Sequence, residues 1–447
     1  MSSISLLISK LLFILFIIIL SFINFYKNEN YYINYKIPKF LKIKTKNKIK
    51  IGIYANYLTN GGRARITTIL VNYFNKINIF DVYLYTLSNK SDNEYKTPID
   101  TKRIIIKNNL ILKILENKID ILIYQLTNIK EINSLNNIKK IKVIFYLHSS
   151  IFYWIYGNDY NYFINLYKAY KNSKYVITLV PLENDYLFKK WGIKSILMNN
   201  FMTYDYYSVI PSDLSSKTIL MIGRAGDKNK RFEIGIKAMK YIIKEIPESK
   251  IKIISSLSGT KKLKKLIRNL NLENNIIFVG YTMKPEKYFK DASLNIFPTL
   301  TEGFPMVLCE TKIYGIPNIL LGLNYVSISQ GGTVIIYDDN PLTVAKESIK
   351  ILKNDRYRKK LGKDARKSMK KYNNKLLIIK WIKLILSIYK GDYYFDLFRK
   401  KDKQMSNKKA LNILNRQIKL IKMRLKRYKY IDIKKLENFT YLQTIKI

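Results

Sequence analysis

Two glutamates stand on either side of a turn that opens a predicted helix. The segment from Thr301 to Glu310 reads TEGFPMVLCE, in which Gly303 and Pro305 form the turn. Free N–H groups at the start of a helix favour an anionic ligand, whereas carboxylates accept hydrogen bonds from hydroxyls. The segment therefore predicts a site for a ligand that carries both kinds of group. Taken singly, Glu302 could cap the helix and Glu310 could lie on the surface.

Two cations follow a predicted strand earlier in the chain. The run ending in Gly223 is followed by Arg224 and, after a short loop, by Lys230. Open α/β sheets bind ligands at the carboxyl ends of their strands. There, Arg can hold phosphate oxygens in a bidentate fork and Lys can add a point charge. The pair suits a diphosphate, although in so basic a chain it could also belong to a solvated loop.

These motifs resemble those of GT-B glycosyltransferases of the family 4 type. The resemblance rests on Gly223-Arg224 with Lys230, on the Glu302–Glu310 spacing around Gly303, Phe304 and Pro305, and on Tyr314-Gly315-Ile316-Pro317, and it covers about residues 48–390. It implies that Glu302 contacts the donor sugar, that Glu310 holds the ribose, and that Arg224 and Lys230 hold the diphosphate. The family usually has Gly after the Lys, and this chain has Arg231.

The first half of the chain contributes two weaker candidates. Asn60-Gly61-Gly62 follows a predicted strand and precedes a helix, so the backbone there could approach a ligand closely, or could simply turn. His148 directly follows the predicted strand 141–147 and is either structural or functional. The resemblance implies that Gly61 and Gly62 lie near the donor phosphate and that His148 lies beside the donor sugar and acceptor. The acidic residue usual after the glycines is absent from Gly62-Arg63-Ala64-Arg65.

Elements that would position these residues alternate between short β-branched runs and longer amphipathic segments, which predicts an α/β protein with two doubly wound, Rossmann-like domains. The resemblance implies that the two domains face a cleft. The expected division is an anchor and basic linker (1–47), an acceptor domain (48–205), a nucleotide-sugar domain (206–375), and a crossover helix with a basic tail (376–447). The expected strands are 51–55, 82–86, 119–124, 141–147 and 175–179, then 218–222, 250–255, 276–279, 293–297 and 333–337.

Composition excludes several classes of protein. The chain has 447 residues and is 48% hydrophobic, which excludes a disordered protein despite a net charge of +48. One Cys and one His exclude a disulfide framework and a Cys/His zinc site. No Asp-x-Asp motif follows a predicted strand, so we expect no metal and no cofactor. Lys is spread evenly along the chain, and we therefore expect no nucleic-acid partner.

The N-terminus carries an uncharged run from Leu11 to Tyr26, which is short for a membrane span but sufficient if the Lys10 side chain extends to the interface. A cleaved signal peptide is the alternative, although no small-residue cleavage site follows the run. The lysines after Tyr26 and the single Cys favour a single-pass anchor with the catalytic domains in the cytosol.

The C-terminal segment from Leu411 to Tyr428 has apolar residues at helical spacing with basic residues between them. This pattern predicts a basic amphipathic helix, either on an anionic membrane surface or in a short coiled coil, and we favour the membrane.

Together these features predict a membrane-anchored glycosyltransferase, metal-independent and retaining, that moves a sugar from a nucleotide sugar donor to an unidentified glycan, lipid or protein acceptor. A non-catalytic relative that binds a nucleotide sugar or acts as a scaffold is the alternative. A basic nucleic-acid-binding protein is a second alternative, which rests on charge alone.

Overall fold

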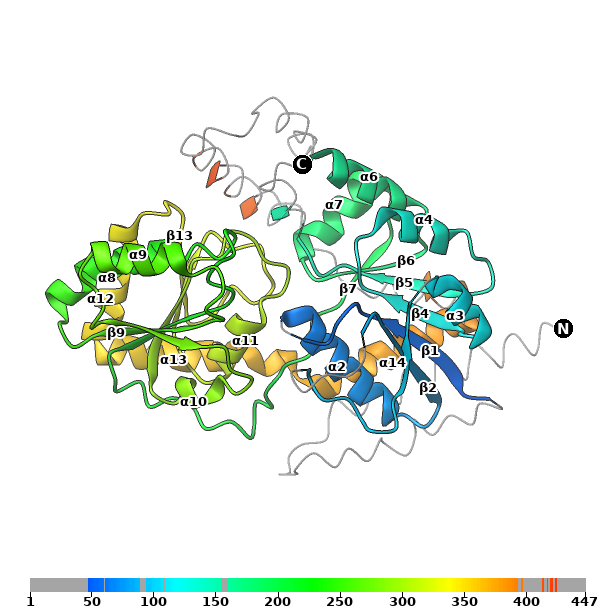
Figure 1. Cartoon of the computed structure of the whole chain (residues 1–447), viewed down its shortest axis with the longest axis horizontal. Helices are drawn as coiled ribbons and strands as arrows, with labels where there is room; N and C mark the ends of the chain where they lie inside the picture. The colour runs from blue at the N-terminus through cyan, green and yellow to red at the C-terminus, as the bar shows by residue number, and fades with distance from the viewer. Residues whose placement is uncertain are drawn as a thin grey trace. The chain divides into compact units, whose positions relative to one another are not determined.

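A computed structural model of the chain describes residues 47–396 except 60, 89–93, 108, 151, 154–159, 393 and 394, together with residues 412, 413, 416, 419, 420 and 423. The predicted anchor, Asn60 and most of the basic tail lie outside the described residues. Two parallel sheets dominate the described part (Figure 1). The prediction of two Rossmann-like domains is therefore confirmed.

The first sheet has the strand order β3-β2-β1-β4-β5-β6-β7, and its neighbouring strands all pair in parallel. Its first strand, IKIGIY, is almost wholly buried, as expected of a central parallel strand covered on both faces. Its strands are β1 (Ile49–Tyr54), β2 (Phe80–Thr86), β3 (Lys102–Ile105), β4 (Ile121–Tyr124), β5 (Lys142–Tyr146), β6 (Tyr175–Thr178) and β7 (Ser195–Leu197). The helices between them are α2 (Gly62–Asn75), α3 (Leu110–Glu116), α4 (Ile129–Asn136), α6 (Tyr160–Lys171) and α7 (Pro181–Trp191).

The second sheet has the order β10-β9-β8-β11-β12-β13, again with parallel pairs throughout. Its strands are β8 (Thr218–Ile222), β9 (Lys250–Ile254), β10 (Ile276–Gly280), β11 (Ala292–Phe297), β12 (Asn318–Leu321) and β13 (Thr333–Ile336). Its helices are α8 (Phe232–Glu245), α9 (Lys261–Asn269), α10 (Glu286–Phe289), α11 (Met306–Ile313), α12 (Pro341–Lys353) and α13 (Asp355–Met369). The short 3-10 helix η3 (Lys370–Tyr372) and the long helix α14 (Asn374–Lys390) follow.

Helices cover both faces of the second sheet (Figure 1). Along β8, Ile219 and Met221 belong to one hydrophobic cluster, together with residues of α8, α9 and α12. Leu220 and Ile222 belong to a separate cluster with Phe289 and Tyr314. Successive strand residues point to opposite faces, so each face of β8 has its own core. This double coverage leaves the strand ends as the place where polar residues can gather.

Helix α14 packs against the first sheet, although it follows the second one in the chain. Trp381 is fully buried, and its ring lies 5.9 Å from that of Phe74 and 5.5 Å from that of Tyr146. Lys142 donates hydrogen bonds to two carbonyl groups at the end of α14, at 2.8 Å each. Helix α14 therefore completes the core of the first domain.

Three strands were not predicted: β3, β7 and β12. Each contains an apolar run of only two or three residues, because β3 begins with Lys and Arg, β12 begins with Asn, and β7 has three residues in all. The four-residue strand β4, which was predicted, is apolar throughout. None of the helices within the described part of the chain is long and apolar enough to cross a membrane.

Arg416 of the tail contacts the second domain, which neither the membrane nor the coiled-coil interpretation included. The guanidinium of Arg416 lies 5.9 Å from the centre of the Tyr337 ring, and Leu420 is 2% exposed.

Candidate functional site

The loop after β8 and the turn after β11 are joined by an ion pair. Lys230 Nζ lies 2.5 Å from Glu302 Oε1, and both side chains are mostly buried. The neighbouring Asn229 donates to the carbonyl of Thr301 and accepts from its backbone N–H, each at 3.1 Å. Lys230 and Glu302, both predicted to bind the sugar donor, therefore meet at the carboxyl ends of the adjacent strands β8 and β11.

Arg224 does not join this pair. Its side chain is 78% exposed and lies 2.8 Å from Asp227, which is in the same loop. The structure thus brings Lys230, but not Arg224, next to Glu302. An exposed guanidinium can still swing toward an anionic ligand, since its partner contributes little stabilisation at the surface.

Arg231 occupies the position at which the resembling family usually has Gly. Its φ angle is 48°, in the left-handed region that Gly adopts most readily. The guanidinium is buried, donates to the carbonyl of Pro298 at 2.8 Å, and lies 2.7 Å from Asp339. These bonds hold the backbone in the conformation that the loop requires.

Glu310 lies in α11, and its side chain is only 2% exposed. Its carboxylate forms an ion pair with Arg65 of α2 and accepts a hydrogen bond from Thr203 Oγ1 at 2.8 Å. Burial raises the pKa of Glu310, while Arg65 and Thr203 lower it part of the way back. Because the guanidinium of Arg65 already bonds to this carboxylate, a ligand hydroxyl could bind there only by displacing the guanidinium or by donating to the carboxylate beside it.

The turn that opens α11 lies against the first domain. A Cβ atom at Gly303 would lie 2.5 Å from the carbonyl oxygen of His148, so no side chain fits there. Phe304 is buried, with its ring 5.8 Å from that of Tyr372. The structure therefore places the predicted residues Gly303 and His148 in direct backbone contact.

The glycine loop of the first domain approaches the same helix. Gly61 precedes α2 with a φ angle of 100°, which a side chain would disfavour. A Cβ atom at Gly62 would lie 3.5 Å from Met306 Cγ, at the first residue of α11. The predicted Gly61–Gly62 pair therefore lies near the N-terminus of α11.

His148 is held in a chain of neutral hydrogen bonds. Its Nε2 atom lies 2.8 Å from Gln125 Oε1, and Gln125 Nε2 donates to Thr67 Oγ1 at 2.9 Å. With its amide NH₂ so engaged, Gln125 presents an acceptor, and His148 must donate from Nε2 and carry its lone pair on Nδ1. Burial, together with a smaller contribution from the positive charge of Arg63, lowers the pKa of His148 to about 3. The imidazole is therefore a neutral acceptor at physiological pH.

The site also includes four residues that the sequence patterns do not predict: Gln125, Arg65, Thr203 and Tyr325. Gln125 directly follows β4, so the strand-end argument that selected His148 could have selected it too. Arg65 was noted only as a departure from the family pattern. Tyr325 accepts a hydrogen bond from the backbone N–H of Glu302 at 3.0 Å, and nothing in the local pattern indicated that contact.

This arrangement has the two Rossmann-like domains of the GT-B fold, with polar residues at the strand ends. Sucrose-phosphate synthase from Thermosynechococcus elongatus aligns with a TM-score of 0.64 at 14% identity, over 76% of this chain and 99% of that one. Anabaena HepE, solved with UDP-glucose, aligns with a TM-score of 0.62 at 13% identity, over 76% and 100%. At such low identity these likenesses concern the fold alone.

Residues 208–368 match the family model described as glycosyl transferases group 1. The chain is 29% identical over 150 residues to poly(glycerol-phosphate) alpha-glucosyltransferase of Bacillus subtilis (strain 168), across 33% of this chain. It is 26% identical over 164 residues to poly(ribitol-phosphate) alpha-N-acetylglucosaminyltransferase of Staphylococcus aureus (strain COL), across 35% of this chain. The chain spans 22% of the first relative's length and 33% of the second's.

Proposed function

We propose that the protein is a glycosyltransferase of the family 4 type that moves a sugar from a nucleotide diphosphate donor to an acceptor hydroxyl, with retention and without a metal ion. The observation that carries the proposal is the meeting of Lys230 and Glu302 beside the start of α11, with Glu310 inside the same helix. Cation, helix N-terminus and carboxylates together match a ligand that has both phosphates and hydroxyls.

Each residue has a distinct role in this proposal. Lys230 and the first N–H groups of α11 bind the diphosphate, and Arg224 reaches it from its exposed position. Glu302 accepts from a hydroxyl of the donor sugar, and Glu310 accepts from the ribose. The neutral His148 accepts a hydrogen bond at Nδ1 from a sugar or acceptor hydroxyl.

In the transfer, the bond between the anomeric carbon and the diphosphate oxygen breaks, and the acceptor oxygen bonds to that carbon. The nucleotide diphosphate leaves with the bonding electrons, and one of its oxygens takes the proton that the acceptor hydroxyl loses. Lys230 and the helix N-terminus stabilise this growing negative charge, as fixed donors do in other group transfers. The relatives named above are alpha-transferases, and an α-linked donor gives an α-linked product when its configuration is retained.

The direct test is to incubate the purified full chain with a panel of nucleotide sugars, with UDP-glucose first because the HepE structure holds it. We expect release of a nucleotide diphosphate, persisting in EDTA, and saturable binding of the nucleotide alone by calorimetry. A chain that binds no nucleotide and releases none would contradict the proposal.

The alternative of a non-catalytic relative gives a different result in the same experiment. Such a protein would bind the nucleotide sugar but would release no nucleotide diphosphate with any acceptor tried. The nucleic-acid alternative predicts a strongly salt-dependent affinity for DNA or RNA. Titration at two salt concentrations tests it separately.

We also propose that the apolar run from Leu11 to Tyr26 anchors the protein in a membrane, with its body in the cytosol. The proposal rests on sequence, because this run lies outside the described residues. Alkaline carbonate extraction of the full chain should leave it in the membrane pellet. Ile18→Lys should release it, whereas the matched Ile18→Leu should not, and equal behaviour of the two variants would overturn the assignment.

A further inference from the structure

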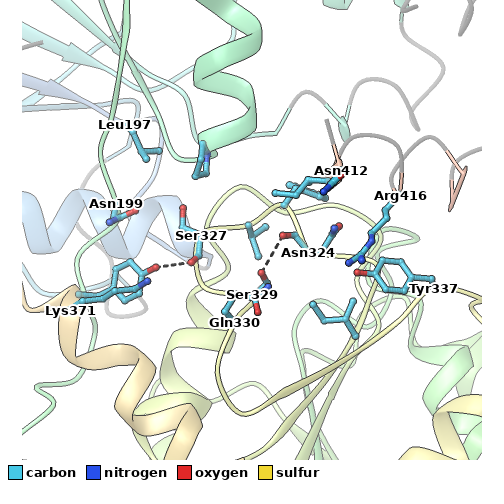
Figure 2. Close-up of a pocket in the computed structure, with 16 residues that line it drawn as sticks. Leu197, Asn199, Asn324, Ser327, Ser329, Gln330, Tyr337, Lys371, Asn412 and Arg416 are labelled. Atoms are coloured by element: carbon cyan, nitrogen blue, oxygen red, sulfur yellow. Dashed lines mark hydrogen bonds between the residues drawn. The ribbon is translucent and has the colours of Figure 1, made fainter. Parts of the chain in front are cut away.

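A pocket of about 980 Å³ with a mixed polar and apolar lining is formed in part by the loop after β12 (Figure 2). One wall is the loop 324–330 between β12 and β13, and the others come from residues after β7, from η3 and from the described part of the tail. The loop touches the donor site through Tyr325, which accepts a hydrogen bond from the Glu302 backbone. The pocket therefore adjoins the residue proposed to hold the donor sugar.

Four hydrogen bonds fix the loop 324–330 in place. Lys312 of α11 is fully buried, and its ammonium donates to the carbonyls of Ile328 and Gln330 at 2.5 and 2.6 Å. Tyr372 donates to the carbonyl of Ser327 at 2.7 Å, and Ser329 to that of Asn324 at 3.2 Å (Figure 2). A wall fixed by four such bonds loses little conformational entropy when a ligand binds.

Charge in the pocket has one sign. Its lining includes Lys371 and Arg416 and contains no Asp or Glu. Lys371 is exposed, and Arg416 lies over the ring of Tyr337. Neither cation is within 4 Å of a carboxylate among the described residues. Both side chains are exposed within the described part of the chain, so an anionic ligand in the pocket can reach them.

Part of the remaining lining matches hydroxyl groups, and the other part is apolar (Pro181, Leu197, Val326, Ile335 and Ile413). Side-chain amides and hydroxyls both donate and accept hydrogen bonds, as sugar or polyol hydroxyls do. The amide oxygen of Asn199 is buried and has no hydrogen-bond partner within the described part of the chain. The polar lining consists of Asn199, Asn324, Ser327, Ser329, Gln330, Tyr337 and Asn412.

We propose that this pocket binds an anionic, hydroxyl-rich segment of the acceptor chain. The inference rests on the proposed function, since it assigns the substrate class of the acceptor. The volume is at the upper end of ordinary ligand pockets, so it suits several linked units better than one monosaccharide. The negative groups can be phosphodiesters or carboxylates, because Lys371 and Arg416 would bind either.

The test measures binding of labelled oligomers of matched length to the full chain. The probes are a glycerol-phosphate hexamer, a galacturonate hexamer and the neutral maltohexaose, and calorimetry with UDP runs in parallel. At least one anionic hexamer should bind at least tenfold more tightly than maltohexaose. The stronger of the two identifies the anionic group.

A paired variant and its control separate the pocket from the general basicity of the chain. Lys371→Gln with Arg416→Gln should weaken binding of the anionic hexamer about tenfold, the scale of two exposed charge contacts. Lys261→Gln with Lys262→Gln removes the same charge from exposed positions at the start of α9. This control pair should change the affinity for the anionic hexamer less than twofold. Neither pair should alter UDP binding.

Three outcomes would overturn the inference: no hexamer binds, maltohexaose binds as tightly as the anionic probes, or both variants weaken binding equally. If UDP still binds in those cases, only the acceptor assignment fails. If UDP does not bind either, the proposed function fails as well.

Discussion

The strand ends of the two sheets differ in their charge. At the second sheet, Lys230 pairs with Glu302, and the nearby Glu310 pairs with Arg65. At the first sheet, His148 and Gln125 form a neutral chain that ends on Thr67. Lys230 suits the diphosphate, which gains charge in the reaction, whereas the two carboxylates and the neutral chain suit hydroxyls.

The difference also concerns what a ligand must displace. A donor that binds at the second sheet meets two carboxylates that already have cationic partners, so it must exchange with those partners. The neutral chain around His148 needs no exchange, because Nδ1 already carries a lone pair. Binding of the complete nucleotide sugar should therefore depend strongly on substitutions at the charged strand ends of the second sheet. It should depend weakly on substitutions at the neutral strand ends of the first sheet.

The largest expected effect comes from removing Arg65. Arg65→Met leaves the carboxylate of Glu310, which is 2% exposed, without its cation. Loss of one member of such a buried pair should lower the free energy of unfolding by about 3 kcal/mol. Urea denaturation measures it. Adding Glu310→Gln to Arg65→Met should restore most of the loss, and a double variant no more stable than Arg65→Met would show that the pair is not the cause.

Lys230→Ala should lower turnover about 100-fold, since it removes the cation proposed to stabilise the departing diphosphate. Turnover at saturating donor is the measurement. Arg224→Ala is the matched control, because that side chain is 78% exposed, and its loss should be less than about tenfold. Near-normal turnover in Lys230→Ala would remove this residue from the diphosphate site.

The two carboxylates should separate in a binding experiment with the nucleotide diphosphate alone. Glu310→Gln should weaken binding about tenfold, the loss expected for one charge-assisted hydrogen bond to the ribose. Glu302→Gln should leave binding within about twofold and should reduce only sugar transfer. Calorimetry on both variants is sufficient, and equal losses would contradict the division of roles.

The smallest effect concerns pH and the neutral edge. The pKa of His148 in the folded protein, about 3, lies below its ordinary value, so between these two values only the unfolded chain binds the proton. Stability therefore falls as pH falls below about 6.5, by about 1 kcal/mol from pH 6 to pH 5 for this residue. His148→Gln should reduce that slope by the same amount in urea denaturation. An unchanged slope would show that His148 is charged in the folded protein.

Sequence predicted the second domain's site better than the first's. Glu302 and Glu310 lie on one short turn and helix, so their spacing in the chain already fixes their spacing in space. The contacts of Glu310 with Arg65, and of Gly303 with His148, join residues far apart in the chain, and no local pattern indicates them. Arg224 was placed with Lys230 because both follow β8, but its pairing with Asp227 depends on how the loop turns.

The strands show the same limit. Runs such as Thr218–Ile222 are apolar throughout because both faces are buried, and these were predicted closely. Strand β12 is a run of only four residues, and its first residue, Asn318, is a buried Asn that accepts from Asn295 at 2.7 Å. A buried polar pair interrupts the apolar pattern of the sequence, although the backbone at that position still forms the hydrogen bonds of the sheet. The position of β12 is therefore evident only from its pairing with β11 and β13.

Helix α14 has a consequence for how the protein is made. Chains emerge from the ribosome N-terminus first, and domains generally fold as they emerge. The core of the first domain includes Trp381, which is synthesised only after the whole second sheet. Until then the surfaces of Phe74 and Tyr146 that Trp381 covers stay open to solvent. The domain that is translated first is thus completed last, and a nascent chain that stalls before Asn374 presents an apolar face for chaperones to bind.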